Sequence, residues 1–394
     1  MPSWGRFLVF ALVLGVLSAL LHYYVWARVI RDAALPLPWS RIATSVLIGF
    51  AIALPLSMPF ARLLPRAAAV PVATVIYTWL GLLFLLFIGV LVGDLVRLVI
   101  VGGDRLADFF RESPRQIDPA RRAALGRLVA AVVGIGAVGA AVFGVASARG
   151  PIATRKVKVA LKRLPASMAG FTIAQLTDVH VGPTIGHDFL ADVVKRVNAL
   201  NPDAVVITGD LVDGSVDDLR EHVAPLGELR AKHGVFFVTG NHEYYSGADA
   251  WIAELTRLGV RVLRNERVEL RVGDDVIDLA GIDDFSAHQF GHGADLPRAL
   301  SGRDPSRELV LLAHQPRAIV EAAKLGVGLQ LSGHTHGGQI WPWNYLVYLQ
   351  QPYVAGLHRH GDAQIYVSRG TGYWGPPMRV GAPAEITQIE LSPA

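Results

Sequence analysis

The chain has no cysteine in its 394 residues. This absence excludes a disulfide framework, and it excludes any metal site built on thiolates. A metal in this protein would have to be held by the oxygen and imidazole groups of Asp, Glu, Asn and His. The absence assigns no compartment, because a chain without cysteine is compatible with either side of a membrane.

Charged residues are also scarce. They make up 18% of the chain against 52% hydrophobic residues, and the mean hydropathy is +0.38, which excludes an ordinary soluble protein. The apolar excess lies in four long runs, which cover residues 7–27, 42–61, 70–101 and 128–148. Each run is long enough to cross a bilayer and is apolar on every face. We therefore predict four transmembrane helices in a membrane domain of residues 1–150.

The four runs are expected to anchor the chain rather than to transport a solute. Asp94 and Arg97 are the charged residues inside them, and one helix brings this pair close enough to neutralise each other. A cleaved signal peptide is disfavoured, because three further runs follow the first. The basic residues behind the net charge of +4 cluster beside the runs. This indicates contact with lipid headgroups and makes nucleic acid an unexpected partner.

From residue 151 onward, short apolar segments alternate with helical patterns. Strands are expected at 172–176, 204–208, 235–239, 276–280, 309–312, 329–331, 364–367 and 386–391, with a basic entry strand between 149 and 165. Helices are expected at 187–200, 217–231, 249–258 and 317–325. This alternation predicts an α/β catalytic domain over residues 151–394. The late strands have little helix between them, so part of the sheet should be mixed or antiparallel.

Polar motifs follow five of the predicted strands. They read Asp178-Val179-His180, Gly209-Asp210, Gly240-Asn241-His242-Glu243, Ala313-His314 and Gly333-His334-Thr335-His336. Any one of them alone would suggest a turn or a surface histidine. Together they supply carboxylate, amide and imidazole ligands for two adjacent cations, which can activate water and neutralise a phosphate at the same time.

Local geometry gives three further expectations for these motifs. Asp178 and His180 should reach one cation from a strand-to-loop turn. Asp210, which follows a glycine that lets the backbone turn sharply, could bridge two cations with its two oxygens. A strand-like segment would make His334 and His336 project the same way.

The series resembles the calcineurin-like metallophosphoesterase superfamily, whose pattern is D-x-H, G-D-x-x-D, G-N-H-[DE], H and G-H-x-H. Gly337-Gly338-Gln339 and the apolar N-terminal region resemble the transmembrane branch of that superfamily. The resemblance covers residues 171–394. It implies a two-sheet metallophosphoesterase sandwich flanked by helices, preceded here by the four transmembrane helices.

The resemblance also implies a role for each motif residue. Asp178, His180 and His336 would hold the first metal, Asn241, His314 and His334 the second, and Asp210 would bridge them. His242 is expected to act in catalysis, by protonating the leaving oxygen or steadying the phosphoryl group, without binding metal. Glu243 or Asp213 would orient a neighbouring histidine, and the alternative for Asp213 is a helix or turn cap.

The expected cofactors are two divalent or trivalent metal ions. The oxygen and nitrogen ligands favour Mn, Fe or Zn, with Co and Ni also compatible, and the four imidazoles make Mg alone a poor match. The predicted activity is hydrolysis of phosphodiester or pyrophosphate bonds through a metal-bridging hydroxide. The anchor favours lipid-linked or envelope substrates, and a UDP-2,3-diacylglucosamine-type glycolipid pyrophosphohydrolase is a specific alternative. A non-catalytic membrane sensor that retains the fold is disfavoured, because no expected ligand is missing.

Several other polar or aromatic residues are weaker candidates. For the loop at 281–293, a solvated loop is favoured over a cleft lining; its polar residues are Asp283, Asp284, His288 and His292. A surface or packing role is favoured for His358, Arg359, His360, Arg369 and Arg379, although Arg369 or Arg379 could contact a phosphate. Trp341 and Trp343 either form an apolar wall or approach lipid.

The membrane orientation is predicted from the number of spans and from the basic residues beside them. Four spans place the N-terminus and the catalytic domain on the same side, and basic residues near the spans number nine on each side. Arg121-Arg122, shortly before the fourth run, resemble an internal twin-arginine export signal. We therefore expect a multi-pass protein of the bacterial inner membrane, with the catalytic domain outside the cytoplasm.

Overall fold

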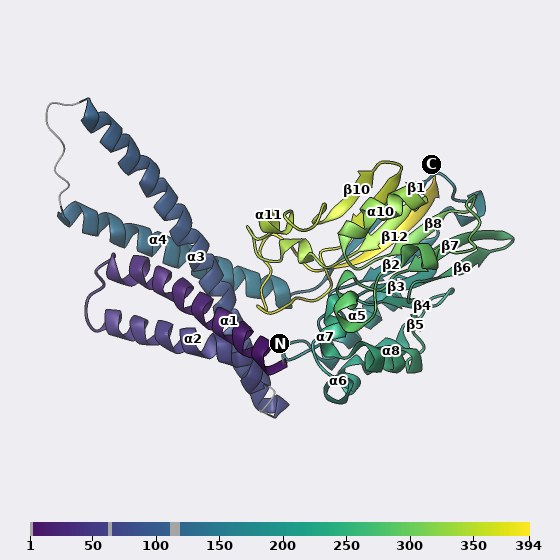
Figure 1. Cartoon of the computed structure of the whole chain (residues 1–394), viewed down its shortest axis with the longest axis horizontal. Helices are drawn as coiled ribbons and strands as arrows, with labels where there is room; N and C mark the ends of the chain where they lie inside the picture. The colour runs from purple at the N-terminus through teal and green to yellow at the C-terminus, as the bar shows by residue number, and fades with distance from the viewer. Residues whose placement is uncertain (1–2, 62–64, 111–118) are drawn as a thin grey trace. The chain divides into compact units, whose positions relative to one another are not determined.

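A computed structural model describes residues 3–61, 65–110 and 119–394 of the chain. The chain divides into two compact units, which are treated separately (Figure 1). The membrane unit comprises residues 1–146 with Gly375–Met378, and the catalytic unit comprises Ser147–Trp374 with Arg379–Ala394.

The membrane unit is built from four long helices. They are α1 (Ser3–Trp26, continued by a π-helical turn at Ala27–Arg31), α2 (Trp39–Ala61), α3 (Arg66–Phe109) and α4 (Pro119–Arg149). Each contains a stretch long and apolar enough to cross a membrane: Ala11–Arg31, Trp39–Ser57, Ala67–Gly103 and Ala123–Arg149. The chain is therefore a multi-pass membrane protein with four candidate spans.

Asp94 in α3 has a different partner from the one that the sequence predicted. Its Oδ2 accepts hydrogen bonds from Nε of Arg28 and from the hydroxyl of Tyr24, both at 2.8 Å. These residues belong to the first helical segment, so the half-buried carboxylate joins two helices. The predicted pairing with Arg97 is wrong. Sequence spacing indicates only partners within the same helix, and the partners of Asp94 lie on a different helix.

The catalytic unit contains two six-stranded mixed sheets. The first has the order β1 (Ala153–Leu161), β12 (Glu385–Pro393), β2 (Thr172–Leu176), β3 (Ala204–Thr208), β4 (Val235–Val238) and β5 (Arg261–Val262). The second has the order β10 (Gly356–His360), β11 (Ala363–Val367), β9 (Leu329–Ser332), β8 (Leu309–Leu312), β7 (Asp275–Gly281) and β6 (Glu266–Val272). Strands β2 to β5 are parallel, as are β11, β9, β8 and β7, while β12–β2, β10–β11 and β6–β7 pair antiparallel.

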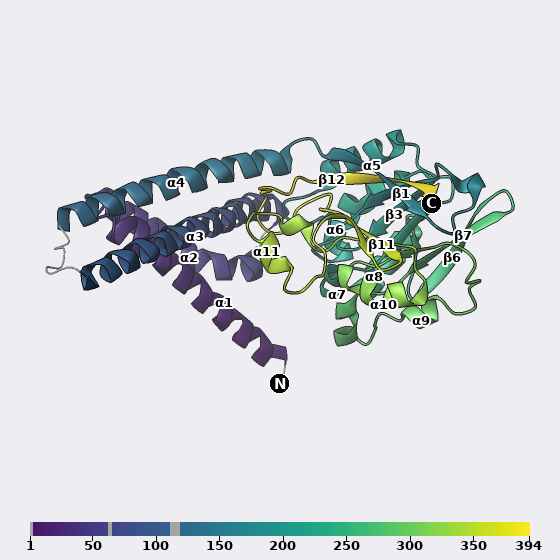
Figure 2. The same ribbon diagram turned by 90° about the horizontal axis from the view of Figure 1, so that it is seen from above.

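Helices cover the outer face of each sheet (Figures 1 and 2). One core lies between the first sheet and α5 (His187–Ala199), α6 (Val216–Val223) and α8 (Ala248–Arg257). A second core fills the space between the sheets, and a third lies beneath α9 (Leu296–Ala299) and α10 (Ile319–Ala322). These layers confirm the predicted two-sheet sandwich with flanking helices.

The strand sequences explain this layering. In β3, Val205 and Ile207 contribute to the helix-side core, whereas Ala204 and Val206 face the other sheet. A strand buried on both faces reads as a continuous apolar run, which is why β3 was recognisable from sequence. Each fully buried Val or Ile contributes about 1.5–3 kcal/mol relative to an exposed one.

Some elements differ from the expectation. The edge strand β6 was missed because its buried Val268 and Leu270 alternate with charged residues instead of forming an apolar run. The helix expected at 217–231 ends at Val223 and continues as a 3-10 helix over Ala224–Glu228, where Pro225 lacks a backbone N–H. The helix expected at 317–325 is divided into 3-10 segments on either side of α10.

The topology gathers the polar motifs at one edge. Parallel strands β2, β3 and β4 of the first sheet and β8 and β9 of the second end there, and each is followed by a motif. Gln175 joins the two sheets beside this edge, because its Nε2 donates to Thr208 Oγ1 at 2.9 Å and to Ser332 O at 3.0 Å.

Candidate metal centre

The first ligand cluster combines the end of β2 with the turn after β9. Nε2 of His180 lies 3.1 Å from Nε2 of His336, which in turn lies 3.4 Å from Oδ1 of Asp178. All three side chains are buried. Asp178 is held by the Thr177 hydroxyl at 2.8 Å and by the backbone N–H of His334 at 3.0 Å. Burial raises the pKa of Asp178, and so does the charge of Asp210, so a cation would be favoured beside it.

The second cluster combines β3, β8 and the same turn after β9. Nε2 of His314 lies 3.1 Å from Oδ2 of Asp210 and 3.2 Å from Nδ1 of His334. His314 Nδ1 donates to the carbonyl oxygen of Thr208 at 2.7 Å. Because a carbonyl can only accept, this bond fixes the tautomer that leaves Nε2 free as a ligand.

Asn241 begins α7 (Asn241–Ser246) directly after β4. Its side-chain Oδ1 is buried and has no hydrogen-bond partner among the residues that the structure describes. The next residue, His242, donates its backbone N–H to Oδ1 of Asp210 at 2.9 Å, so this turn lies against Asp210. A buried amide oxygen without a partner is costly unless it has a ligand to bind.

Asp210 lies between the two clusters. Its Oδ2 is 3.1 Å from Nε2 of His314 and 3.9 Å from Nε2 of His180. The sequence suggested that both oxygens could bridge. In the structure Oδ2 is the oxygen nearest to His314 and His180, and Oδ1 accepts the backbone N–H of His242 at 2.9 Å.

The donor groups fit two cations. Metal bonds to nitrogen and oxygen of about 2.0–2.2 Å place neighbouring ligand atoms about 3–3.5 Å apart. Two of the separations in each cluster, between 3.1 and 3.4 Å, lie in this range, and all three ligand atoms of each cluster lie within 4.8 Å of one another. The unpartnered oxygen of Asn241 is a further donor atom that fits a cation.

The two histidines of the last motif project into different clusters. His334 and His336 have φ of 70° and 51°, and Thr335 between them is helical, so the segment is a turn. The expectation of a strand-like segment with both rings on one side is therefore wrong. The left-handed turn delivers one imidazole to each cluster.

Backbone strain is concentrated at the predicted metal ligands. Five of the seven predicted metal ligands have positive φ: Asp178, His180, Asp210, His334 and His336. Such conformations cost about 1–3 kcal/mol each and persist where the surrounding structure or a function requires them. Gly209 has φ of 87°, and a Cβ there would lie 2.6 Å from the Gly240 nitrogen, so only glycine fits this turn.

Asp213 orients two imidazoles. Its Oδ1 lies 3.0 Å from Nδ1 of His180 and 2.6 Å from Nδ1 of His242. Burial would raise the pKa of Asp213, but the facing His180 and His242 outweigh it and bring the value to about 2. Of the two roles considered from sequence, the side chain therefore supports neighbouring histidines instead of capping a helix or turn.

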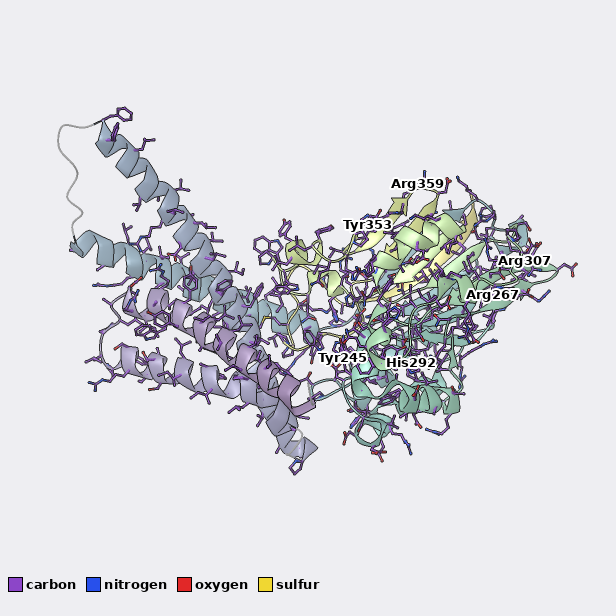
Figure 3. The ribbon with its side chains drawn as sticks, in the orientation of Figure 1. Tyr245, Arg267, His292, Arg307, Tyr353 and Arg359 are labelled. Carbon is purple, nitrogen blue, oxygen red and sulfur yellow. The ribbon has the colours of Figure 1, made fainter. Side chains whose placement is uncertain are left out.

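His242 lies at the rim of the clusters, with Nε2 4.0 Å from Oδ2 of Asp210. Burial would lower its pKa, but Asp210 and Asp213 raise it to about 9. Its ring is flanked edge-on by Tyr245 and Trp374, each with a centroid separation of 5.5 Å (Tyr245 is labelled in Figure 3). The sequence analysis did not identify Tyr245 or Trp374 as neighbours of His242. The contact with Tyr245 could have been predicted, because residues three apart on one helix lie on the same face.

Glu243 holds backbone instead of a histidine. Its carboxylate accepts hydrogen bonds from the N–H groups of Asp210, Leu211 and Gly240 at 3.0, 2.8 and 2.7 Å. Burial and the charge of Asp210 raise its pKa to about 7. The side chain thus ties the turn after β3 to the start of α7.

The weaker candidates in the loop at 281–293 divide between buried and exposed positions. Asp283 and Asp284 are 3% and 2% exposed, so the solvated-loop interpretation is wrong for them. Asp283 forms a two-bond ion pair with Arg264 at 2.9 Å, and Asp284 accepts from Gln315 at 3.0 Å. His288 is exposed. His292, which is labelled in Figure 3, is half-buried.

The remaining basic candidates have packing or surface positions. Arg379 is fully buried and donates to the carbonyl oxygens of Gly372 and Ala382, both at 2.8 Å. Arg369 pairs with Glu385 at 3.0 Å. His358, Arg359 and His360 belong to the edge strand β10, with Arg359 exposed (Figure 3).

The two-sheet fold and the two His/Asp ligand clusters are the features expected of the metallophosphoesterase class. A family model described as calcineurin-like phosphoesterase matches residues 171–338, and the chain belongs to this family.

Three relatives show the extent of the similarity. A bovine (Bos taurus) transmembrane protein with metallophosphoesterase domain is 47% identical over 266 residues, covering 64% of this chain and 60% of that protein. The Danio rerio protein of the same description is 38% identical over 333 residues, covering 80% and 74%. An uncharacterized metallophosphoesterase of Helicobacter pylori strain J99 is 44% identical over 224 residues, covering 56% and 60%. The chain thus spans about 60% of the length of the first and third of these relatives.

Proposed function

We propose that the protein is a membrane-anchored phosphoesterase that uses two metal ions to hydrolyse phosphodiester or pyrophosphate bonds, and that its substrates are lipid-linked or belong to the cell envelope. The observation that carries the proposal is the pair of buried ligand clusters that share Oδ2 of Asp210. When bound, two such cations supply an activated water and neutralise the phosphate charge.

We assign each cluster residue a role in that reaction. Asp178, His180 and His336 hold one ion, Asn241, His314 and His334 hold the other, and Asp210 contacts both. Asp213 fixes the ring orientations of His180 and His242 through their Nδ1 atoms. His242 then presents Nε2 to the leaving oxygen and donates a proton to it, and its raised pKa favours the protonated ring.

The first test measures hydrolysis of a chromogenic phosphodiester and the matching monoester by the full chain in detergent. Metal-stripped protein is assayed with and without added Mn²⁺ or Zn²⁺, beside Asp210→Ala and a surface control, Asp188→Ala. Metal-dependent turnover that Asp210→Ala abolishes and Asp188→Ala retains would support the proposal. Equal turnover in the Asp210→Ala variant would refute it.

Substrate class is tested separately. The catalytic unit is covalently joined to the candidate membrane spans, so the panel includes a UDP-2,3-diacylglucosamine-type glycolipid pyrophosphate beside soluble nucleotide diesters. Faster turnover of the lipid substrate would support the lipid-linked assignment. Metal binding without turnover of any panel member would favour the sensor alternative.

We also propose that the catalytic unit lies outside the cytoplasm of a bacterium. The support is the Arg121-Arg122 pair before the fourth span, which resembles an export signal. A reporter enzyme that is active only outside the cytoplasm, fused after Ala394, should be active. Activity of a cytoplasm-specific reporter at the same position would contradict the orientation.

A further inference from the structure

Residues 341–349, here called the aromatic segment, carry much of the exposed apolar surface of the catalytic unit. Six of its large side chains are between 49% and 81% exposed: Trp341, Trp343, Tyr345, Leu346, Tyr348 and Leu349. They account for half of the twelve exposed large hydrophobic side chains between Ser147 and Ala394. Apolar surface concentrated in this way usually marks an interaction site.

The chemistry of the segment matches a lipid interface. No Asp, Glu, Lys or Arg occurs between His336 and Arg359, although charged residues make up 18% of the chain. The exposed residues are two tryptophans, two tyrosines and two leucines. Trp and Tyr concentrate at the headgroup level of membranes, where a polar atom stays wet while the ring is buried, and charged side chains are costly deeper in the bilayer.

The segment is a fixed part of the fold. At its start, the Trp341 N–H donates to Val380 O at 2.9 Å. Just after its end, the buried Gln351 accepts from the Arg317 N–H at 3.0 Å. Between these anchors, Asn344–Val347 forms the short helix α11. The side chains are therefore presented on an ordered scaffold that needs no folding on binding.

The covalent connection keeps a bilayer within reach. Helix α4 ends at Arg149 and β1 begins at Ala153, so three residues separate the last candidate span from the first strand of the catalytic unit. An extended chain reaches about 3.5 Å per residue, so the linker spans only about 14 Å. A linker this short gives the catalytic unit a high effective concentration at the membrane surface. Even a weak affinity of the aromatic segment for lipid headgroups would then lead to docking.

We propose that the aromatic segment inserts into the headgroup region of the bilayer that the chain's own helices cross. This inference does not depend on the phosphoesterase activity, because it rests on the exposed side chains and the absence of charge. The segment begins five residues after His336, so docking would hold the edge of the metal-ligand clusters at the membrane surface.

The absence of native cysteine makes a direct test possible. Leu349→Cys, at an 81% exposed position, is labelled with an environment-sensitive fluorophore in the full chain reconstituted into nanodiscs. The control is Asp274→Cys in the exposed β6–β7 turn, which lies at the opposite end of the catalytic unit from α11 (Figures 1 and 2). The nanodiscs contain phosphatidylcholine and phosphatidylglycerol, with lipids that carry a nitroxide near the headgroup. The nitroxide quenches the fluorescence only of a label that lies in the bilayer.

We expect the Leu349→Cys label to emit at shorter wavelength and to be quenched at least twofold more by the nitroxide lipids than the Asp274→Cys label. Equal, water-like emission from both labels would overturn the proposal. A blue-shifted label that the lipids do not quench would also overturn it, because a second copy or another protein surface would then cover the segment.

A second labelled position guards against a local artefact. Tyr348→Cys, 55% exposed, should give the same result, and both variants should retain the metal content of the parent protein as a check on folding. Adding Trp341→Ser and Trp343→Ser to the Leu349→Cys protein should reduce the quenching at least twofold. Unchanged quenching in that protein would contradict insertion through the aromatic side chains.

Discussion

At the scale of single residues, His242 and Asp213 separate metal binding from catalysis. His242 shares Asp213 with the predicted ligand His180, but its Nε2 is 4.0 Å from the nearest oxygen of Asp210. A histidine in this position can donate a proton without belonging to either of the two ligand sets.

His242→Gln should therefore lower kcat by about 10²- to 10⁴-fold, the usual contribution of a positioned proton donor, and leave two metal ions bound. Metal content by elemental analysis and turnover of a chromogenic phosphodiester are measured on the same preparation. Loss of one equivalent of metal would instead make His242 a ligand, an arrangement that its proximity to His180 and Asp213 also permits.

Asp203 gives a prediction for the pH dependence of stability. Burial would raise its pKa, but the Lys232 ammonium at 2.7 Å and the backbone and hydroxyl of Thr172 lower it. The folded state thus favours the carboxylate. The resulting stabilisation is present above the unfolded-state pKa of about 3.9 and is lost as the pH falls through the lower folded-state value.

Asp203→Asn should destabilise the catalytic unit by about 1 kcal/mol at pH 7, and the difference should shrink as the pH falls below about 4. Thermal unfolding of both proteins is followed with chelator present at each pH, so that metal loss does not contribute. A difference that grows toward low pH would show that the interaction favours the protonated side chain.

At the scale of elements, Glu243 links the turn after β3 to α7. Three backbone N–H groups point at one carboxylate, and two of them share Oε2. This clamp fixes the segments that present Asp210 and Asn241. The stability of the centre therefore depends on a residue that binds no metal.

Glu243→Gln leaves one oxygen for three donors and turns an amide NH₂ toward backbone N–H. We expect a loss of about 1–3 kcal/mol in unfolding free energy and at least tenfold weaker metal binding. Glu243→Asp, which keeps the charge on a shorter side chain, is the matched variant and should retain more of both. Wild-type metal affinity in Glu243→Gln would exclude a role in positioning the ligands.

The strands that carry the site were predictable because each is a continuous apolar run ending in a polar motif. β3 and Asp210 are the clearest case, since Val205 to Ile207 are buried on both faces and the next turn requires Gly209. The part that could not be predicted depends on contacts across the chain. The bond from the Gly240 N–H to Glu243 is local, but no local pattern shows that Glu243 also accepts from Asp210 and Leu211, or that Asp94 pairs with Arg28. Those partners lie far away in sequence.

At the scale of the catalytic unit, each ligand cluster joins the two sheets. The first takes Asp178 and His180 from the end of β2 and His336 from the turn after β9. The second takes Asp210 from the end of β3, with His314 and His334 from the ends of β8 and β9. A bound cation therefore adds a cross-link between layers that otherwise meet through the apolar core between the sheets.

Metal removal should consequently lower the stability of the whole catalytic unit. A ligand at 100 times its Kd stabilises the folded state by about 2.7 kcal/mol, which corresponds to a Tm change of roughly 5–10 °C for a domain of this size. Chelation should lower the Tm of the full chain by that order, and added Mn²⁺ or Zn²⁺ should restore it. Asp210→Ala is the control, because its Tm should respond much less to either treatment. An unchanged wild-type Tm after complete removal of metal, verified by elemental analysis, would mean that the ions do not couple the two sheets.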